Sequence, residues 1–424
     1  MRSRLIAVFG CAVLALGVAA CGDDDDTSSD SGGTDTGQTA SGGGSVNVYS
    51  SLPLQGASKD QTNAMVQGIQ LALEEAGGKA GDTTVNYESL DDSTAQAGNW
   101  DPGQVAQNAR KVAGDDKAVY YIGEFNSGAS AISIPILNQA GIPQVSPANT
   151  YVGLTTNEPG SEKGEPDKYY PSGSRTYLRI VPRDTIQAAA LLTKMKEDGC
   201  TKVALANDKD TYGAGLARLI ELQAPDAGVE LTDNVGIDKT ASNFRSVADQ
   251  FKSDGADCFV FGGVTANGAI QLYKDVGAAL PDAKLYGPDG VCESGFTNPA
   301  KKGIPAALGS RFVCSVATLN LDSYPGGKEF LDAFKAKYGG ETPDPYAIYG
   351  YEAMKLGLDT IAGLGADGTD KAKVLEALFA TKDRDSALGT YSFDENGDTT
   401  LTDYGIYAVG DDGNPTFDSK VSSG

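Results

Sequence analysis

Residues 46–146 alternate short apolar runs with amphipathic segments, and this alternation limits the possible folds more than any other feature of the sequence. Strands are predicted at 46–50, 85–90, 118–122 and 142–146. Helices are predicted between them, over 61–76, from the Asp101-Pro102 cap onward, and over 129–139. Strands that alternate with helices form a parallel sheet with helices on both faces.

The alternation resumes after a loop at 153–175 that is rich in Gly, Pro, Glu and Lys. Strands are predicted at 176–180, 201–206, 231–237, 257–262 and 283–286, each followed by a helical segment. Asp184 and Gln187 have the spacing of a capping box at the start of one of these helices. We therefore expect a second parallel sheet over about 176–316. The folded part is longer than the roughly 250–300 residues at which single cores stop growing, so two domains are expected.

The last third of the chain is predicted to be mainly helical, over 328–338, 346–363 and 371–380. Two strand-like runs follow, at 391–393 and 404–409, with Asn396-Gly397 between them. An Asn-Gly pair between strands is typical of a β-hairpin, so these two runs are predicted to pair.

The N-terminus has the pattern of an export signal. Arg2 and Arg4 precede an apolar run at 5–20, which is shorter than the roughly 20 residues that a membrane-spanning helix needs. The end of the run, Val18-Ala19-Ala20-Cys21, resembles the lipobox of bacterial lipoproteins. We expect a signal peptide at 1–20, a lipidated Cys21, and a flexible acidic Gly/Ser tether at 21–45. The alternative is an ordinary secretory signal that is cut before an unmodified Cys21.

The composition excludes several classes of function. Removal of residues 1–20, which carry two arginines and no acid, takes the formal net charge from −23 to −25, and this argues against nucleic acid and against direct adhesion to anionic lipid. The chain has no histidine, so Ser-His-Asp and Cys-His pairs and His-containing metal sites are impossible. No phosphate-loop lysine, G-x-S-x-G elbow or S-x-x-K motif is present. We therefore predict a binding protein with no cofactor and no metal, not an enzyme.

The folded part contains four cysteines, which in an exported protein are predicted to form disulfides. Cys200 precedes the strand at 201–206, and Cys258 precedes apolar residues of another predicted strand. If these strands are parallel neighbours, the two sulfurs lie at the same edge of one sheet. Four cysteines allow three pairings, and we favour Cys200 with Cys258 and Cys292 with Cys314.

Four loops carry candidate ligand-binding residues. Ser127 and Thr150 follow neighbouring strands of the first sheet, where a helix N-terminus favours an anion, so the two hydroxyls could hold one carboxylate. Asp289, after the strand at 283–286, could face an ammonium group, and Tyr212 could form an aromatic wall. The alternatives are ordinary loop hydroxyls, a Pro-Asp-Gly turn and a surface tyrosine.

These motifs together resemble the type 1 periplasmic binding proteins, in particular the branched-chain amino acid receptors of ABC importers. The resemblance covers the folded chain and rests on the order and spacing of five segments: Ile122-Gly123 with the Ser127 loop, 146–150, Asn207-Asp208 with Tyr212-Gly213, 287–290 and 393–398. It implies that Ser127, the Ala148 backbone and Thr150 bind a carboxylate. It also implies that Tyr212 lines the pocket and that Asp289 replaces the usual ammonium-binding glutamate.

The resemblance further suggests Phe125 and Tyr349 as pocket walls. Val264-Thr265 stands where the family usually has an aromatic residue, which puts the identity of the solute in doubt and makes Thr265 a candidate. The implied fold is α/β, with two Rossmann-like lobes joined by a three-strand hinge. Lobe 1 is expected at 46–174 plus 318–385, and lobe 2 at 175–317 plus 386–419.

We therefore expect an extracytoplasmic receptor, lipid-anchored to the outer face of the cell membrane in a Gram-positive-type envelope. As a monomer without other membrane contact, it would deliver a branched-chain or other aliphatic amino acid to the permease subunits of an ABC importer. One alternative keeps the fold but changes the solute to an amide, urea or aromatic acid. Another is a sensory ligand-binding module.

Overall fold

The computed structural model describes residues 44–340 and 342–422, which belong to one compact unit. The expected signal peptide at 1–20, Cys21 and nearly all of the tether at 21–45 lie outside these residues. The first described element is strand β1 (Ser45–Leu52). Within the described ranges, no helix combines the length and the apolar character that crossing a membrane would require.

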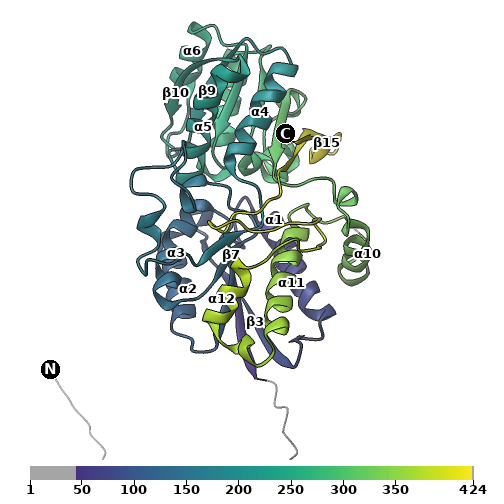
Figure 1. The fold of residues 1–424 in the computed structure, drawn as a ribbon. Coiled ribbons are helices and arrows are strands. Elements are labelled where there is room, and N and C mark those ends of the chain that lie inside the picture. The colour runs from purple at the N-terminus through teal and green to yellow at the C-terminus, as the bar shows by residue number, and fades with distance from the viewer. Residues whose placement is uncertain (1–43, 341, 423–424) are drawn as a thin grey trace, which may run out of the picture. The chain divides into compact units, whose positions relative to one another are not determined.

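The first sheet has the strand order β2-β3-β1-β6-β7-β8 and is parallel apart from the β2–β3 pair. Its other strands are β2 (Lys79–Ala80), β3 (Thr83–Asp91), β6 (Ala118–Gly123), β7 (Gln144–Ser146) and β8 (Tyr177–Arg179). Helices α1 (Lys59–Glu75) and α11 (Ala347–Leu364) pack together, as do α2 (Pro102–Ala113) and α3 (Ser127–Ala140) (Figure 1). Val48 lies in the core with α1 and α11, and its neighbour Tyr49 lies in the core with α2 and α3, as the two-residue period of a strand requires.

The second sheet has the order β10-β9-β11-β12-β13-β14-β15. Its strands are β9 (Lys202–Asn207), β10 (Glu230–Gly236), β11 (Cys258–Gly262), β12 (Lys284–Gly287), β13 (Phe312–Val316), β14 (Asp403–Val409) and β15 (Pro415–Ser422). Val203 packs with α4 (Asp184–Glu197) and α5 (Thr211–Ala227), while Ala204 faces α6 (Arg245–Ser253) and α7 (Ala269–Ala279). Figure 1 shows α4, α5 and α6 around β9 and β10.

The remaining elements are short or peripheral, except for two helices of the last third. These are α10 (Gly327–Tyr338) and α12 (Lys371–Phe379), close to their predicted bounds. The short elements are β4 (Ser93–Thr94), β5 (Asn99–Trp100), α8 (Ser294–Thr297), α9 (Ala306–Gly309) and the 3₁₀ turns η1 (Val152–Leu154), η2 (Asp167–Tyr169), η3 (Thr265–Asn267), η4 (Asp289–Val291), η5 (Pro299–Lys301), η6 (Leu321–Ser323) and η7 (Gly365–Thr369).

The strand expected to open the second sheet instead completes the first. Residues of β8 pair in parallel with β7, from Gln144 opposite Tyr177 to Ser146 opposite Arg179. The loop at 153–175 does not lead into a new domain, because it buries Tyr169 and Tyr170 and returns to the edge of the same sheet. The prediction that a second sheet starts at about 176 was therefore wrong by one strand.

The prediction that the runs at 391–393 and 404–409 pair across Asn396-Gly397 was also wrong. The turn itself forms, with the Asp394 amide donating to the Asp398 carbonyl at 2.9 Å, but it joins only isolated bridges. The later run, β14, pairs antiparallel with β13 and β15 instead. The second sheet offers an open edge at β13, and the segment after β14 reverses tightly enough to add a further strand.

Both predicted disulfides are confirmed. Cys200 is bonded to Cys258, and Cys292 is bonded to Cys314. The reason given by the sequence holds for the first pair, because β9 and β11 are parallel neighbours. The one described group with metal-ligand spacing is Cys200, Asp257 and Cys258, and its two sulfurs are used in this disulfide.

Each sheet has a point at which the strand order reverses. In the first sheet the chain places β3 on one side of β1 and β6 on the other. In the second, β10 and β11 flank β9 in the same way. Loops at the carboxyl ends of such strands form a crevice, which is where open α/β sheets bind ligands. Ser127, Tyr212 and Val264 all follow strands at these two points.

Candidate solute-binding site

The first wall of the site is built from the loops after β6 and β7. Ser127 is the first residue of α3, and its N-cap Asn126 makes no side-chain cap, so the first-turn amides face the loop. Two hydrogen bonds join the loops. The Asn149 amide donates to the Phe125 carbonyl at 2.8 Å, and the Ser146 hydroxyl donates to the Glu124 carbonyl at 2.8 Å. Ser127 and Thr150 are therefore presented by one rigid assembly.

Arg179, which is fully buried, fixes the loop on both sides of Thr150. Its guanidinium donates to the carbonyls of Asn149 at 3.1 Å and Tyr151 at 2.8 Å, and its Nε donates to Asp398 Oδ1 at 2.6 Å. Burial lowers the pKa of Arg179, but the Asp398 carboxylate, with Tyr177 and Asp184, raises it on balance. The Asp394–Asp398 turn, which does not form the predicted hairpin, thus supports the loop that carries Thr150.

Two acids lie buried next to the Ser127 loop. Glu124 accepts a hydrogen bond from the Tyr121 hydroxyl, and burial raises the pKa of Glu124. Burial and the Glu124 charge raise the pKa of Asp92 well above its usual range. Burial therefore favours a proton on this pair of adjacent carboxyl groups.

The second wall comes from the second sheet and centres on Asp289 in η4. The Gln187 amide donates to Asp289 Oδ1 at 2.7 Å, and the Tyr212 hydroxyl donates to the same oxygen. Tyr346, from the N-cap of α11, reaches Asp289 Oδ2 at 3.3 Å and packs edge-on against Phe125 with ring centroids 5.8 Å apart. Burial raises the pKa of Asp289, and the Tyr212, Gln187 and Tyr346 donors oppose this rise.

The two walls enclose one small cavity. It is lined by Phe125, Asn126, Ser127, Ala148, Thr150, Tyr212, Val264, Asp289 and Gly290. Its volume of about 20 Å³ leaves room for roughly one water molecule. Entry of a larger solute therefore requires the two walls to separate.

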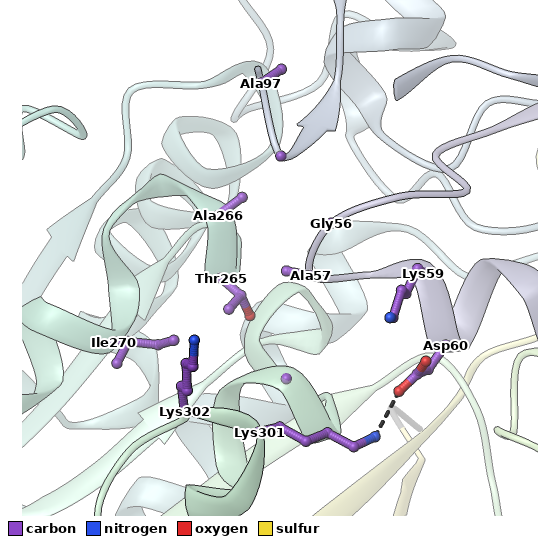
Figure 2. A pocket seen from close by; sticks show the side chains of 12 residues that line it. Gly56, Ala57, Lys59, Asp60, Ala97, Thr265, Ala266, Ile270, Lys301 and Lys302 are labelled. Atoms are coloured by element: carbon purple, nitrogen blue, oxygen red, sulfur yellow. Dashed lines mark hydrogen bonds and ion pairs between the residues drawn. The ribbon is translucent and has the colours of Figure 1, made fainter. Parts of the chain in front are cut away.

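Six of the eight predicted ligand-binding residues line this cavity, and the other two do not. Thr265 lines a separate hollow of about 650 Å³, where Lys301 pairs with Asp60 at 2.6 Å (Figure 2). Tyr349 is buried and donates to the Ala317 carbonyl at 2.7 Å, whereas Tyr346, one turn earlier, points at the site. The two tyrosines could not be told apart from spacing alone.

Sequence reasoning also missed Gln187. It was expected to cap α4 together with Asp184, but Arg183 is the N-cap and makes no side-chain cap. The Gln187 amide turns toward Asp289 instead. Asp184 is buried in the first turn, and burial raises its pKa well above the usual range while the Thr150 hydroxyl opposes this. The i, i+3 spacing of the two side chains suits both arrangements, so no sequence signal separated them.

Two open α/β sheets whose carboxyl-end loops enclose a polar cavity, with hydroxyls on one wall and a carboxylate on the other, are typical of a solute-binding protein. Residues 46–414 match the family model of the periplasmic binding proteins, and the chain belongs to this family. The resemblance stated from the motifs is thus confirmed, as is the expectation of a binding protein and not an enzyme.

Similar proteins cover most of the chain. A Leu/Ile/Val-binding protein of Rhizobium johnstonii is 28% identical over 84% of this chain and 89% of its own length. Among solved structures, a leucine binding protein from Thermotoga maritima has a TM-score of 0.73 at 21% identity, covering 89% of this chain and 99% of that one. A solute binding protein from R. palustris in complex with benzoate has a TM-score of 0.71 at 18% identity, covering 89% and 97%.

Proposed function

We propose that this chain is the receptor of an ABC importer and binds an amino acid between the two walls of the cavity. The observation that carries the proposal is that the Ser127–Thr150 loops, which suit a carboxylate, lie opposite Asp289, which suits an ammonium group. These two groups are the part shared by all α-amino acids. Phe125 and Val264 add apolar surface for a side chain, and the Leu/Ile/Val-binding relative supports a branched-chain or other aliphatic one.

A second candidate is a carboxylic acid without an ammonium group. Both oxygens of Asp289 already accept hydrogen bonds from protein groups, so the acid does not depend on a cationic ligand for its partners. The benzoate-bound neighbour has the same fold. An amide or urea would also suit this arrangement of donors and acceptors.

Capture of the solute is proposed to be a hinge closure of two lobes, 46–174 plus 318–385 and 175–317 plus 386–419, with the correction that β8 pairs within the first sheet. Segments that run between the sheets lie side by side. The Tyr404 hydroxyl donates to the Pro182 carbonyl at 3.1 Å, and the hydroxyls of Tyr407 and Thr318 are 3.0 Å apart. A three-stranded hinge at these segments would let the walls separate.

Thermal-shift screening of the mature chain tests the solute. The twenty amino acids, small amides, urea and benzoate are each added at increasing concentration. A solute at 100 times its Kd stabilises the folded state by about 2.7 kcal/mol, so binding gives a clear rise in the unfolding midpoint. A shift with benzoate or an amide and with no amino acid would exclude the amino acid receptor in favour of the second candidate.

We further propose that the protein works outside the cytoplasm as a monomer, tethered by a lipid on Cys21, and passes its solute to membrane permease subunits. The lipobox-like sequence supports the anchor, and membership of the family supports the location and the partner. Detergent phase partitioning of the natural chain and of Cys21→Ser tests the anchor. The natural chain should enter the detergent phase and the variant should not. Equal partitioning would contradict a lipid on Cys21.

A further inference from the structure

The side-chain amide of Gln187 forms hydrogen bonds at both its nitrogen and its oxygen. It is fully buried on α4, where an unsatisfied amide would cost about 1–3 kcal/mol. Its nitrogen donates to Asp289 Oδ1 at 2.7 Å, Ser315 Oγ at 3.1 Å and the Ser315 carbonyl at 3.3 Å. Its oxygen lies 3.0 Å from the Tyr212 hydroxyl, whose single proton it shares with Asp289 Oδ1.

Ser315 sets which way round the amide lies. Its backbone carbonyl can only accept a hydrogen bond, so the nitrogen of Gln187 must face β13 and the oxygen must face Tyr212. The nitrogen is thereby directed at Asp289 as well. One side chain thus joins two residues of the cavity wall, Tyr212 on α5 and Asp289 in η4, and links both to a strand of the sheet.

We propose that Gln187 is a positioning residue for solute binding, whose amide holds the Asp289 carboxylate and the Tyr212 hydroxyl in the orientation that faces the solute. This inference rests on the proposed function, because it assigns Asp289 to the ammonium group of an amino acid. Gln187 itself does not line the cavity, and its effect passes through the two residues that do.

The Gln187 amide also affects how readily Asp289 ionises. Burial raises the pKa of Asp289, and the hydrogen bonds from Tyr212 and Gln187 lower it. Without the Gln187 donor the pKa of Asp289 rises further, so less of the ionised form is present in acid. Other groups near Asp289 are the buried Asp184, which disfavours its charge, and Tyr346 and Tyr404. Loss of the amide should therefore weaken binding more at low pH than at high pH.

The test compares Gln187→Met with the natural chain by isothermal titration at pH 5.5, 6.5 and 7.5, with leucine, isoleucine and valine as the probes. Methionine keeps the volume and removes the hydrogen bonds. We expect about tenfold weaker binding at pH 7.5, because one hydrogen bond to a charged group is lost. The loss of affinity should be larger at pH 5.5. Gln223→Met, which removes an amide donating to the Thr185 carbonyl at 3.1 Å outside the cavity, should bind normally.

Several outcomes would overturn the inference. Binding by Gln187→Met that equals the natural chain would do so, and so would a loss of the same size at every pH, which a purely structural role predicts. In an Asp289→Asn background, Gln187→Met should add little, and a full additional loss would contradict action through Asp289. If Gln187→Met does not fold, Ser315→Ala should give a smaller loss with the same pH trend. Failure of the natural chain to bind any amino acid would instead overturn the proposed function, and this inference with it.

Discussion

At the scale of single residues, Asp289 places a carboxylate at a partly buried position in the cavity wall. A buried carboxylate needs partners, and here hydroxyl and amide donors from Tyr212, Gln187 and Tyr346 supply them. The side chain is one methylene shorter than the glutamate that the family resemblance implies at this position. Gln187 and Tyr212 contact the shorter acid directly, so its carboxylate is held without a cation.

Asp289→Asn is expected to weaken amino acid binding by about 2–5 kcal/mol, because it leaves a desolvated ammonium group without its counter-charge. Titration calorimetry measures the change. Asp233→Asn, at an exposed position on β10, serves as the matched control. A solute that lacks an ammonium group should bind Asp289→Asn nearly as well as the natural chain, and this result would favour the second candidate.

Glu293 is a second acid whose burial is expected to have a measurable effect, here on the pH dependence of the unfolding free energy. Burial raises its pKa to about 7 from an ordinary value of 4.5, against the opposing hydroxyls of Thr265 and Ser58. The folded state therefore holds a proton that the unfolded state releases between these two values. This contribution to stability is complete below about pH 4.5 and is lost as the pH rises through 7.

Glu293→Gln should remove this pH dependence. The difference in unfolding free energy between the variant and the natural chain should shift in favour of the variant by up to about 3 kcal/mol as the pH rises from 4.5 to 8. Urea unfolding at the two pH values measures the gain. Glu329→Gln, on the exposed face of α10, should leave the difference unchanged. Parallel pH profiles for the natural chain and Glu293→Gln would show that Glu293 titrates normally.

At the scale of elements, α11 shows how one helix serves two purposes. Tyr346 at its start contributes to the site through Asp289 and Phe125. Tyr349, one turn later, joins the helix to the segment after β13, because its hydroxyl donates to the Ala317 carbonyl. The same hydroxyl lies 3.3 Å from the Tyr324 hydroxyl. The first tyrosine contacts two residues that line the cavity, and the second fixes the helix.

Tyr349→Phe is therefore expected to lower the unfolding free energy by about 1 kcal/mol, the usual net value of one hydrogen bond, and to leave solute affinity unchanged. Denaturant unfolding and calorimetry on the same preparation separate the two effects. A clear loss of affinity with normal stability would restore Tyr349 to the pocket wall that the family resemblance implied.

The disulfide between β9 and β11 makes a prediction at the same scale. Cys200 and Cys258 enclose a loop of 58 residues, so Cys200→Ser with Cys258→Ser should cost about 2–4 kcal/mol of unfolding free energy. The bond lies at the edge of the sheet away from the cavity loops, so affinity at a temperature where the variant is folded should stay the same. Reduced affinity in the folded variant would mean that this edge is coupled to the site.

At the scale of the whole molecule, the closed cavity and the contacts between the two sheets' loops indicate how capture works. A volume of about 20 Å³ cannot admit an amino acid unless the walls move. Asp60 on α1 bonds to Lys301 at 2.6 Å and lies 3.3 Å from the Ser294 hydroxyl, so helix α1 is joined to the second sheet's loops. Both charged side chains are about half exposed, so the pair stabilises closure only weakly.

Small-angle scattering should show a smaller radius of gyration with solute than without it, since closure brings the sheets together. Lys301→Met should weaken solute binding by no more than about 1 kcal/mol, and the difference from the natural chain should shrink at high salt. Lys328→Met, which breaks an exposed pair with Asp332 on α10, is the control. An unchanged radius of gyration with a solute that binds tightly would contradict hinge closure.

Features that depend on neighbouring residues could be predicted from the amino-acid sequence. The alternation of apolar periods predicted both sheets and most helices, Asp101-Pro102 predicted the start of α2, and the position of Cys200 and Cys258 beside adjacent strands predicted their bond. The carboxyl ends of the strands then placed Ser127, Thr150 and Asp289 at one cavity. These inferences hold because strand and helix periods are local and because parallel strands all end on one edge.

Features that depend on distant partners could be assigned only from the folded chain. A strand as short as β8 can join either sheet, and its place was fixed by pairing with β7 and by the buried Arg179–Asp398 ion pair. The same holds for Gln187, whose spacing suits a helix cap but whose amide finds Asp289, 102 residues away. Long-range hydrogen bonds in a dry interior outweigh local preferences, since an unmet buried polar group costs more than a cap contributes.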